Sequence, residues 1–123
     1  TYSIRKKLFS LLSKSGAQIA TVISPRAYVS MHADVGKGTI VMHDVLVNAA
    51  ASIGENCIIN TKALIEHDAV IEDFCHISTS AVINGGVVVK EGSFFGSNTV
   101  SKEYIETSRN DFIKAGTLFK GNS

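Results

Sequence analysis

Residues 53–83 read IGENCIINTKALIEHDAVIEDFCHISTSAVI, and an aliphatic residue occupies every sixth position of this stretch. The spacing extends in both directions through thirteen hexads without a miss. The hexads begin at Ile23, Val29, Val35, Val41, Val47, Ile53, Ile59, Ile65, Ile71, Ile77, Ile83, Val89 and Phe95. Four positions after each stands a small or β-branched residue: Ala27, Ala33, Thr39, Val45, Ala51, Cys57, Ala63, Ala69, Cys75, Ala81, Val87, Ser93 and Thr99. A fixed short period indicates one structural unit that is stacked many times.

Six residues suit a short strand followed by a turn, and they do not fit the period of an amphipathic helix. Three such units close one triangular coil, so that equivalent residues of successive coils become neighbours roughly 4.8 Å apart. We therefore predict an all-β fold, a parallel β-helix of hexapeptide repeats preceded by a short α-helix. The hexad leaders and the small residues four positions later are expected to point inward.

Composition bounds the class of protein. The 123 residues favour one domain, and with 45% hydrophobic residues, no Trp and one Pro the core is expected to consist of Val, Ile and Ala. The net charge of +1 gives no electrostatic reason to expect nucleic acid as a partner. The sequence has no apolar run long enough to span a membrane and no signal-peptide pattern, so we expect a cytoplasmic protein.

The two cysteines, Cys57 and Cys75, occupy the small inward position in successive coils. A disulfide between them is conceivable. The favoured interpretation is two small buried hydrophobic residues in a reducing compartment.

The chain is expected to divide into three parts. Residues 1–22 form a helix and a strand, with the helix at 3–15, Ser3 as its N-cap and Gly16 as its stop, and the strand at 18–23. Residues 23–100 form the β-helix. Residues 101–123 are expected to be an irregular tail, because the hydrophobic period fails at Ser101.

The predicted coil leaves apolar columns on two outer faces. One face carries Ile40, Ile58, His76 and Phe94, and the next carries Tyr28, Leu46, Leu64 and Val82. A monomer would expose these columns to water, which marks an association surface. Triangular prisms pack around a three-fold axis, so we predict a homotrimer.

His67 is the strongest candidate for a catalytic residue. It lies at a predicted turn, and the same corner of the next coil carries Gly85, whose N–H is unobstructed because glycine has no side chain. A base beside an accessible N–H is the minimum for acyl transfer, since the base takes a proton and the N–H stabilises an oxyanion. Asp68 can hold the imidazole tautomer. The alternative is that His67 is simply a polar turn residue.

His76 and Asn60 are expected on the face opposite the His67 corner, too far away to cooperate within one subunit. If all of them are functional, the site lies between subunits; alternatively, His76 only fills an apolar interface column. His32 and His43 also fall at turns, which raises the hypothesis of zinc between subunits. No close His pair is expected, so we predict no metal.

The hexads and the motif Asn60-Thr…Glu66-His67-Asp68…His76-Ile-Ser resemble the hexapeptide-repeat acyltransferases, which fold as a left-handed β-helix. The motif is similar to the branch of sialic-acid O-acetyltransferases and N-acetyltransferases of nucleotide-linked 4-amino sugars. The opening Ser3-Ile-Arg-Lys-Lys-Leu resembles the last helix of that family's N-terminal βαβ-type domain, most of which is not present in this sequence.

The resemblance implies a set of roles. His67 matches the general base, Asp68 its acidic neighbour, and Gly85 the glycine whose amide meets the thioester oxygen. His76 and the Gly96-Ser97 turn match residues associated with coenzyme A, and Asn60 matches an asparagine near the acceptor. Lys114 begins a segment that resembles the family's closing motif, and it is expected to contact the cofactor.

From the resemblance we expect an acetyl-CoA-dependent acetyltransferase that modifies an amino group or hydroxyl of a sugar or nucleotide-sugar in bacterial surface-glycan biosynthesis. Its sites are expected between the subunits of a homotrimer. The alternatives are a non-catalytic trimerising β-helix and, less favoured, a zinc-dependent enzyme of the same fold.

Overall fold

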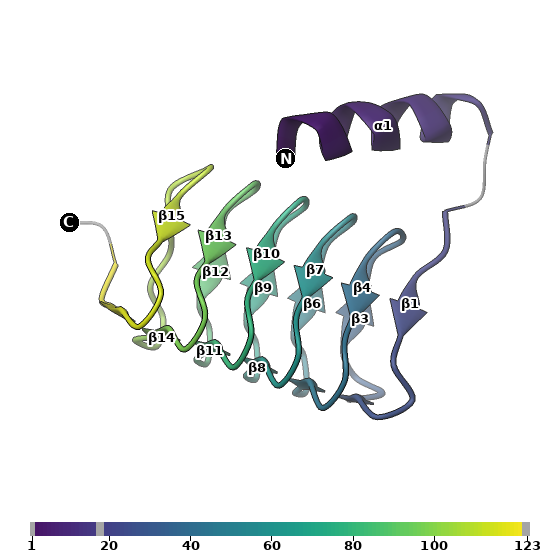
Figure 1. Cartoon of the computed structure of the whole chain (residues 1–123). Helices are drawn as coiled ribbons and strands as arrows, with labels where there is room; N and C mark the ends of the chain where they lie inside the picture. Colours follow the sequence, from purple (N-terminus) through teal and green to yellow (C-terminus); the bar gives the residue numbers. More distant parts are fainter. Residues whose placement is uncertain (1, 17–18, 122–123) are drawn as a thin grey trace.

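The computed structural model describes residues 2–16 and 19–121 as one helix followed by a stack of triangular coils (Figure 1). The elements are α1 (Tyr2–Lys14), β1 (Val22–Ile23), β2 (Tyr28–Val29), β3 (Asp34–Val35), β4 (Ile40–Val41), β5 (Leu46–Val47), β6 (Ser52–Ile53), β7 (Ile58–Ile59), β8 (Leu64–Ile65), β9 (Val70–Ile71), β10 (His76–Ile77), β11 (Val82–Ile83), β12 (Val88–Val89), β13 (Phe94–Phe95), β14 (Val100–Ser101), β15 (Phe112–Ile113) and β16 (Leu118–Phe119).

The strands form three parallel sheets, one for each side of the triangle. Sheet A has the order β1-β4-β7-β10-β13-β15, sheet B has β16-β14-β11-β8-β5-β2, and sheet C has β12-β9-β6-β3. Each strand pairs in register with the strand one coil away, as His76 does with Ile58 and Phe94. The predicted left-handed parallel β-helix is confirmed.

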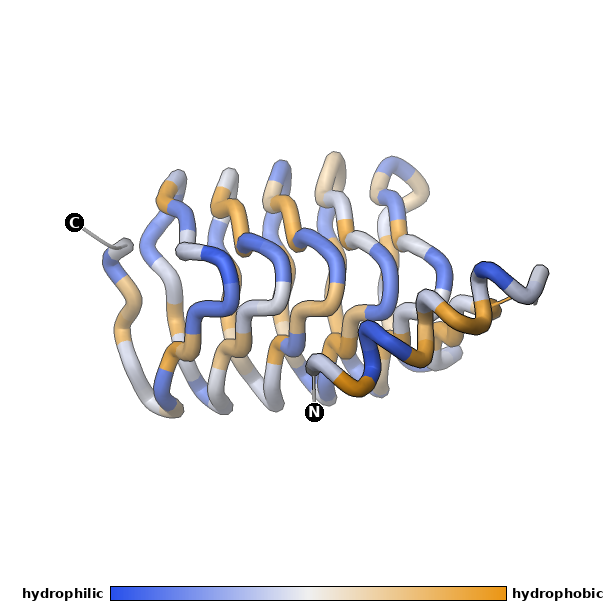
Figure 2. Tube along the Cα trace, turned by 90° about the horizontal axis from the view of Figure 1, so that it is seen from above, coloured by the Kyte–Doolittle hydropathy of each residue, from blue (hydrophilic) through white to orange (hydrophobic). Residues whose placement is uncertain are grey.

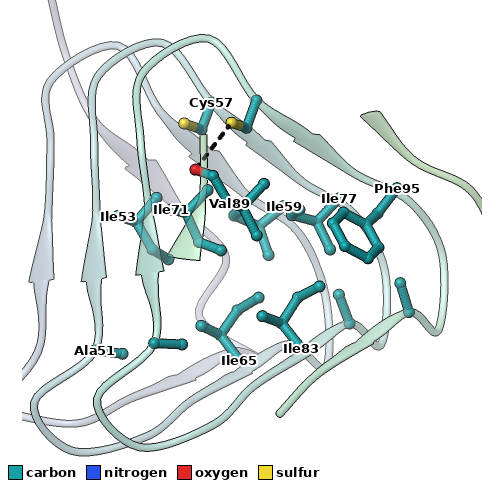
Figure 3. Close-up of a cluster of buried hydrophobic side chains, with 14 of the residues drawn as sticks. Ala51, Ile53, Cys57, Ile59, Ile65, Ile71, Ile77, Ile83, Val89 and Phe95 are labelled. Atoms are coloured by element: carbon teal, nitrogen blue, oxygen red, sulfur yellow. Dashed lines mark hydrogen bonds between the residues drawn. The ribbon is translucent and has the colours of Figure 1, made fainter. Parts of the chain in front are cut away.

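The core is a column of aliphatic side chains along the axis of the coil. Leaders such as Ile59, Ile77 and Ile83 are fully buried and meet side chains from the other two sheets (Figure 3). The residue before each leader is exposed or partly exposed, and polar and apolar residues alternate along the coils (Figure 2). Burial of this apolar column is the main favourable term in folding.

Cys57 and Cys75 are free thiols in this core. Each thiol also contacts main-chain carbonyls, Cys57 that of Glu72 at 3.1 Å and Cys75 that of Lys90 at 3.2 Å. A hydrogen bond with the Cys57 thiol, together with burial, raises the pKa of Cys75. The Cys75 thiol is therefore protonated at neutral pH, and both cysteines act as packing residues in the core.

Turns of one kind join the strands from β3 onward. The third residue after each leader adopts a left-handed conformation from Gly38 to Gly116, for example with φ of 61° at Asp68. Asn, Asp and Gly, which tolerate this conformation best, occupy many of these positions. The bulkiest exceptions are Phe74 and Tyr104, with φ of 60° and 53°.

The coil continues past the point where the sequence indicated an irregular tail. Ser101, Thr107, Ile113 and Phe119 take the leader position and are buried, and left-handed residues recur at the same spacing. The prediction for 101–123 was wrong in the described part because two leaders are polar. Their hydroxyls form hydrogen bonds inside the coil, such as that from Lys90 N–H to Thr107 Oγ1 at 2.8 Å.

Helix α1 lies along the corner between sheets C and A (Figure 1). Phe9 packs edge-to-face on Phe74, with ring centroids 5.5 Å apart, and Arg5 donates to the Asn56 carbonyl at 2.8 Å. The helix begins at Tyr2, so Ser3 is not its N-cap, whereas Gly16 follows its last turn with φ of 80°. Of the strand expected at 18–23, Val22–Ile23 is present and residue 18 lies outside the described residues. No described helix has the length and apolarity needed to cross a membrane.

Candidate active site

His67 lies at the corner that joins sheet B to sheet C, in the turn between β8 and β9. It stands two residues after the leader Ile65, where the turn directs side chains away from the core, and half of its side chain is exposed (51%). Its Nδ1 is 3.1 Å from Oδ2 of Asp68. When the carboxylate accepts Nδ1–H, the unprotonated ring nitrogen is Nε2, which is the form a general base requires.

Gly85 lies directly beneath the His67 ring in the next coil. A Cβ at Gly85 would stand 2.7 Å from both Cε1 and Nε2 of His67, so only glycine leaves room for the imidazole in this position. The Gly86 N–H donates to the His67 carbonyl at 3.0 Å, which ties the two coils together at this corner. The ring is thus held against the backbone of the Gly85-Gly86 turn.

The Gly85 amide donates to no acceptor within the described part of the chain. The equivalent amides of Ala49 and Thr61 each donate to the side-chain oxygen of the preceding asparagine, Asn48 and Asn60, at 2.8 and 2.7 Å. An exposed base and an uncommitted N–H therefore meet at one corner. This pair could remove a proton from a nucleophile and stabilise an oxyanion.

The other predicted site residues lie elsewhere in the same chain. His76 is on sheet A, while Asn60, Gly96, Ser97 and Lys114 follow sheet A strands at the corner between sheets A and B. Sheet A is the side of the triangle opposite the His67 corner. The structure thus brings His67, Asp68 and Gly85 together, and it does not bring the second group to them within one chain.

Two residues of the second group also have structural explanations. The side-chain oxygen of Asn60 caps the next amide, as that of Asn48 does two strands earlier. Gly96 is required by packing, since a Cβ there would lie 2.5 Å from the Ala115 nitrogen of the next coil. Neither feature points to a ligand by itself.

His76 has an unusual environment on sheet A. Its ring packs edge-to-face on Phe94, with centroids 5.1 Å apart, and Phe94 stacks on Phe112 at 4.9 Å. Its Nε2 is buried and has no hydrogen-bond partner in the described residues. Burial, and secondly the positive charge of Arg5 in α1, lower the pKa of His76. No motif or repeat in the sequence indicates that α1 approaches this histidine.

Tyr104 is a further residue at the His67 corner that sequence reasoning missed. It follows Gly85-Gly86 by one coil, its N–H donates to the Gly85 carbonyl at 3.0 Å, and its ring covers the Cα of Gly86. Its side chain is otherwise exposed (73%). Tyr104, Asn110 and Gly116 all adopt the left-handed conformation, at a spacing of six residues. Asn110 and Gly116 are residue types typical of such turns, and their spacing is the sequence signal that could have placed Tyr104 at this corner.

No group of three or more His, Cys, Asp or Glu side chains that could hold a metal gathers among residues 2–16 and 19–121. His43, which was considered as a metal ligand, instead lies 2.6 Å from the Ser24 hydroxyl through Nδ1.

Solved structures with this architecture are known. The chain is 27% identical to the acetyltransferase domain of PglB from Neisseria gonorrhoeae, with a TM-score of 0.96 over 98% of this chain and 59% of that one. It is 30% identical to PerB from Caulobacter crescentus, solved with CoA and GDP-perosamine, with a TM-score of 0.93 over 97% of this chain and 58% of that one. The chain is therefore similar in sequence and in fold to sugar acetyltransferases built on a left-handed β-helix.

The similarity covers only part of each of these two proteins. The chain spans about three fifths of the length of these two proteins. WeeI from Acinetobacter baumannii, at 20% identity and a TM-score of 0.73 over 95% of this chain and 61% of that one, shares the fold. No protein-family model matches the chain. A search of curated proteins found no match either.

The environment of His76 predicts a pH dependence. A lowered pKa means that the unfolded chain binds this proton more readily than the folded one, so the free energy of unfolding should decrease as pH falls from about 6.5, the ordinary value, to the pKa of folded His76. An NMR titration of the ring protons should give a midpoint below 6.5. The pH dependence of chemical denaturation should be weaker in His76→Gln. A midpoint at or above 6.5 would contradict this description of the ring.

Proposed function

We propose that this protein transfers the acetyl group of acetyl-CoA to the amino group of a nucleotide-linked sugar in surface-glycan biosynthesis. The observation that carries the proposal is the stacking of His67, which is oriented by Asp68, on Gly85, whose amide is uncommitted. The similarity to two acetyltransferases supports the reaction class. PglB has been solved with acetyl coenzyme A and PerB with CoA and GDP-perosamine, which supports the choice of donor and acceptor.

The proposed reaction is direct transfer without an acyl-enzyme. The neutral amine of the acceptor attacks the thioester carbonyl while Nε2 of His67 takes its proton, and the Gly85 N–H stabilises the oxyanion of the tetrahedral intermediate. Collapse of this intermediate completes the amide, breaks the C–S bond and releases CoA as a thiolate. An acceptor hydroxyl would follow the same course and would give an ester.

The remaining site residues are proposed to act from a neighbouring subunit. His76, Gly96, Ser97 and Lys114 would contact CoA, and Asn60 would contact the acceptor, because these residues lie on a different side of the coil from His67. A homotrimer would bring the sheet A side of one subunit to the His67 corner of the next. The cytoplasm, where acetyl-CoA is made, is the proposed location.

Exposed apolar side chains support the proposed trimer. Sheet A exposes Phe112 (70%), and sheet B exposes Tyr28 and Leu118. These residues stand at the ends of columns that run the whole length of each sheet. A surface of this kind is typical of an interface between protein molecules.

Replacement of the base tests the proposed function. His67→Ala should lower kcat by ~10²–10⁴-fold, the usual contribution of a general base, in an assay that detects the free thiol of CoA in the presence of a nucleotide-linked amino sugar. His43→Ala is the matched control, because His43 holds the equivalent turn position at the corner between sheets A and B. The control should keep wild-type turnover.

Two results would count against the proposal. Equal turnover in His67→Ala and wild type would remove His67 from the mechanism. No thiol release by the wild type with any amino sugar or sugar hydroxyl would favour the competing function, a β-helix that only trimerises.

The trimer can be tested separately from the chemistry. Sedimentation equilibrium should give a mass of about 39 kDa, three times the 13.1 kDa of the chain. Leu46→Lys, which adds a charge to the sheet B column beside Tyr28, should shift the distribution toward monomer because an unpaired buried charge is costly. Lys102→Ala, an exposed change outside the columns, should leave the trimer intact. A 13.1 kDa species in the wild type at all concentrations would contradict the trimer.

A further inference from the structure

The turn before Gly85 departs from the regular hydrogen-bond ladder. In most coils the residue after a leader donates its N–H to the main-chain carbonyl of the leader one coil later, as Asn48 does to Ile65 and Asn60 does to Ile77, both at 2.8 Å. Lys90 departs from this pattern, because it donates to the Thr107 hydroxyl. Asn84 also departs from it and donates its N–H to the side-chain hydroxyl of Ser101 at 2.9 Å. The main-chain carbonyl of Ser101 is then available to accept the side-chain amide of Asn84, at 2.7 Å.

This exchange changes what the asparagine side chain does. Asn48, Asn60 and Asn84 occupy the same place in their hexads, immediately after a leader. The first two turn Oδ1 back onto the next main-chain amide and occupy it. Asn84 is anchored to Ser101 through Nδ2, and the next amide, that of Gly85, has no acceptor in the described part of the chain.

We propose that Ser101 is a positioning residue, which keeps the Gly85 N–H available by holding the Asn84 side chain away from it. This inference rests on the proposed function, in which that amide stabilises the oxyanion. The inference also explains why the aliphatic series of leaders first breaks at Ser101. Its hydroxyl accepts the Asn84 N–H in place of the main-chain carbonyl of residue 101.

An aliphatic residue at position 101 should reverse the arrangement. Without the hydroxyl, the Asn84 N–H would donate to the main-chain carbonyl of residue 101, as the N–H groups of Asn48 and Asn60 do to Ile65 and Ile77. The asparagine side chain would then lose its anchor and occupy the Gly85 amide, as Asn48 and Asn60 do at their turns. The acyl donor would have to displace this hydrogen bond in every turnover.

Ser101→Val is the decisive variant, and it fits the inward pattern of the other leaders. We expect hydrogen exchange at the Gly85 amide to slow by about 10-fold, and kcat to fall by about 10-fold, the scale of one competing neutral hydrogen bond. The melting temperature should be equal to or above that of the wild type, which separates the effect from unfolding. Ser101→Thr keeps a hydroxyl and should behave as the wild type does.

A second substitution provides the rescue. In the double variant Ser101→Val/Asn84→Ala no asparagine remains to occupy the amide, so fast exchange at Gly85 and most of the turnover should return. A merely structural role for Ser101 would not be rescued by removal of another side chain. Asn60→Ala is the control for exchange at a normal turn, and it should speed exchange at the Thr61 amide.

The two measurements separate this inference from the proposed function. Unchanged exchange at Gly85 in Ser101→Val, or a double variant that stays slow, would overturn the role of Ser101 whatever the activity. Exchange that changes as expected while the wild type shows no acetyl transfer would support the positioning role and reject the proposed function. Exchange that changes while kcat does not would show that the amide takes no part in catalysis, and the inference as stated would be wrong.

Discussion

Main-chain hydrogen bonds between successive coils determine which side chains of this molecule become neighbours. They stack equivalent residues of parallel strands in register, so that position in the hexad decides which side chain lies above which. At the His67 corner the same bonds join Gly86 to His67 and Tyr104 to Gly85, each at 3.0 Å. The positions of the candidate base and of the amide beneath it are therefore held by a network of main-chain hydrogen bonds, which is the kind of support that a catalytic geometry requires.

The same network of main-chain hydrogen bonds explains why small departures from the repeat have only local effects. A glycine at Gly85 admits the His67 ring, and a serine at Ser101 redirects one asparagine without disturbing the coil. Bulky residues in left-handed turns are stabilised by contacts beyond the turn itself. Phe74 is covered by Phe9 of helix α1, and Tyr104 packs on Gly86. Departures of this kind concentrate where a helix packs or where the candidate site lies.

Much of the fold was predictable because the period alone specifies it. The inward and outward columns, and the placement of His67 over Gly85, followed from residues one coil apart. The end of the β-helix was not predictable from hydrophobicity, because Ser101 and Thr107 are buried through hydrogen bonds and not through apolar character. The approach of Arg5 to His76 was also missed, since no repeat relates helix α1 to the coil.

Whether the His67 corner receives the acyl donor is the central question for function. The most direct measurement is a titration of acetyl-CoA into ¹⁵N-labelled protein, with the Gly85 amide followed by NMR. A downfield shift of the Gly85 proton that saturates with ligand, while the Gly92 amide, bonded to the Asp73 carbonyl, does not move, is the predicted result. An unchanged Gly85 amide at saturating acetyl-CoA would contradict the account.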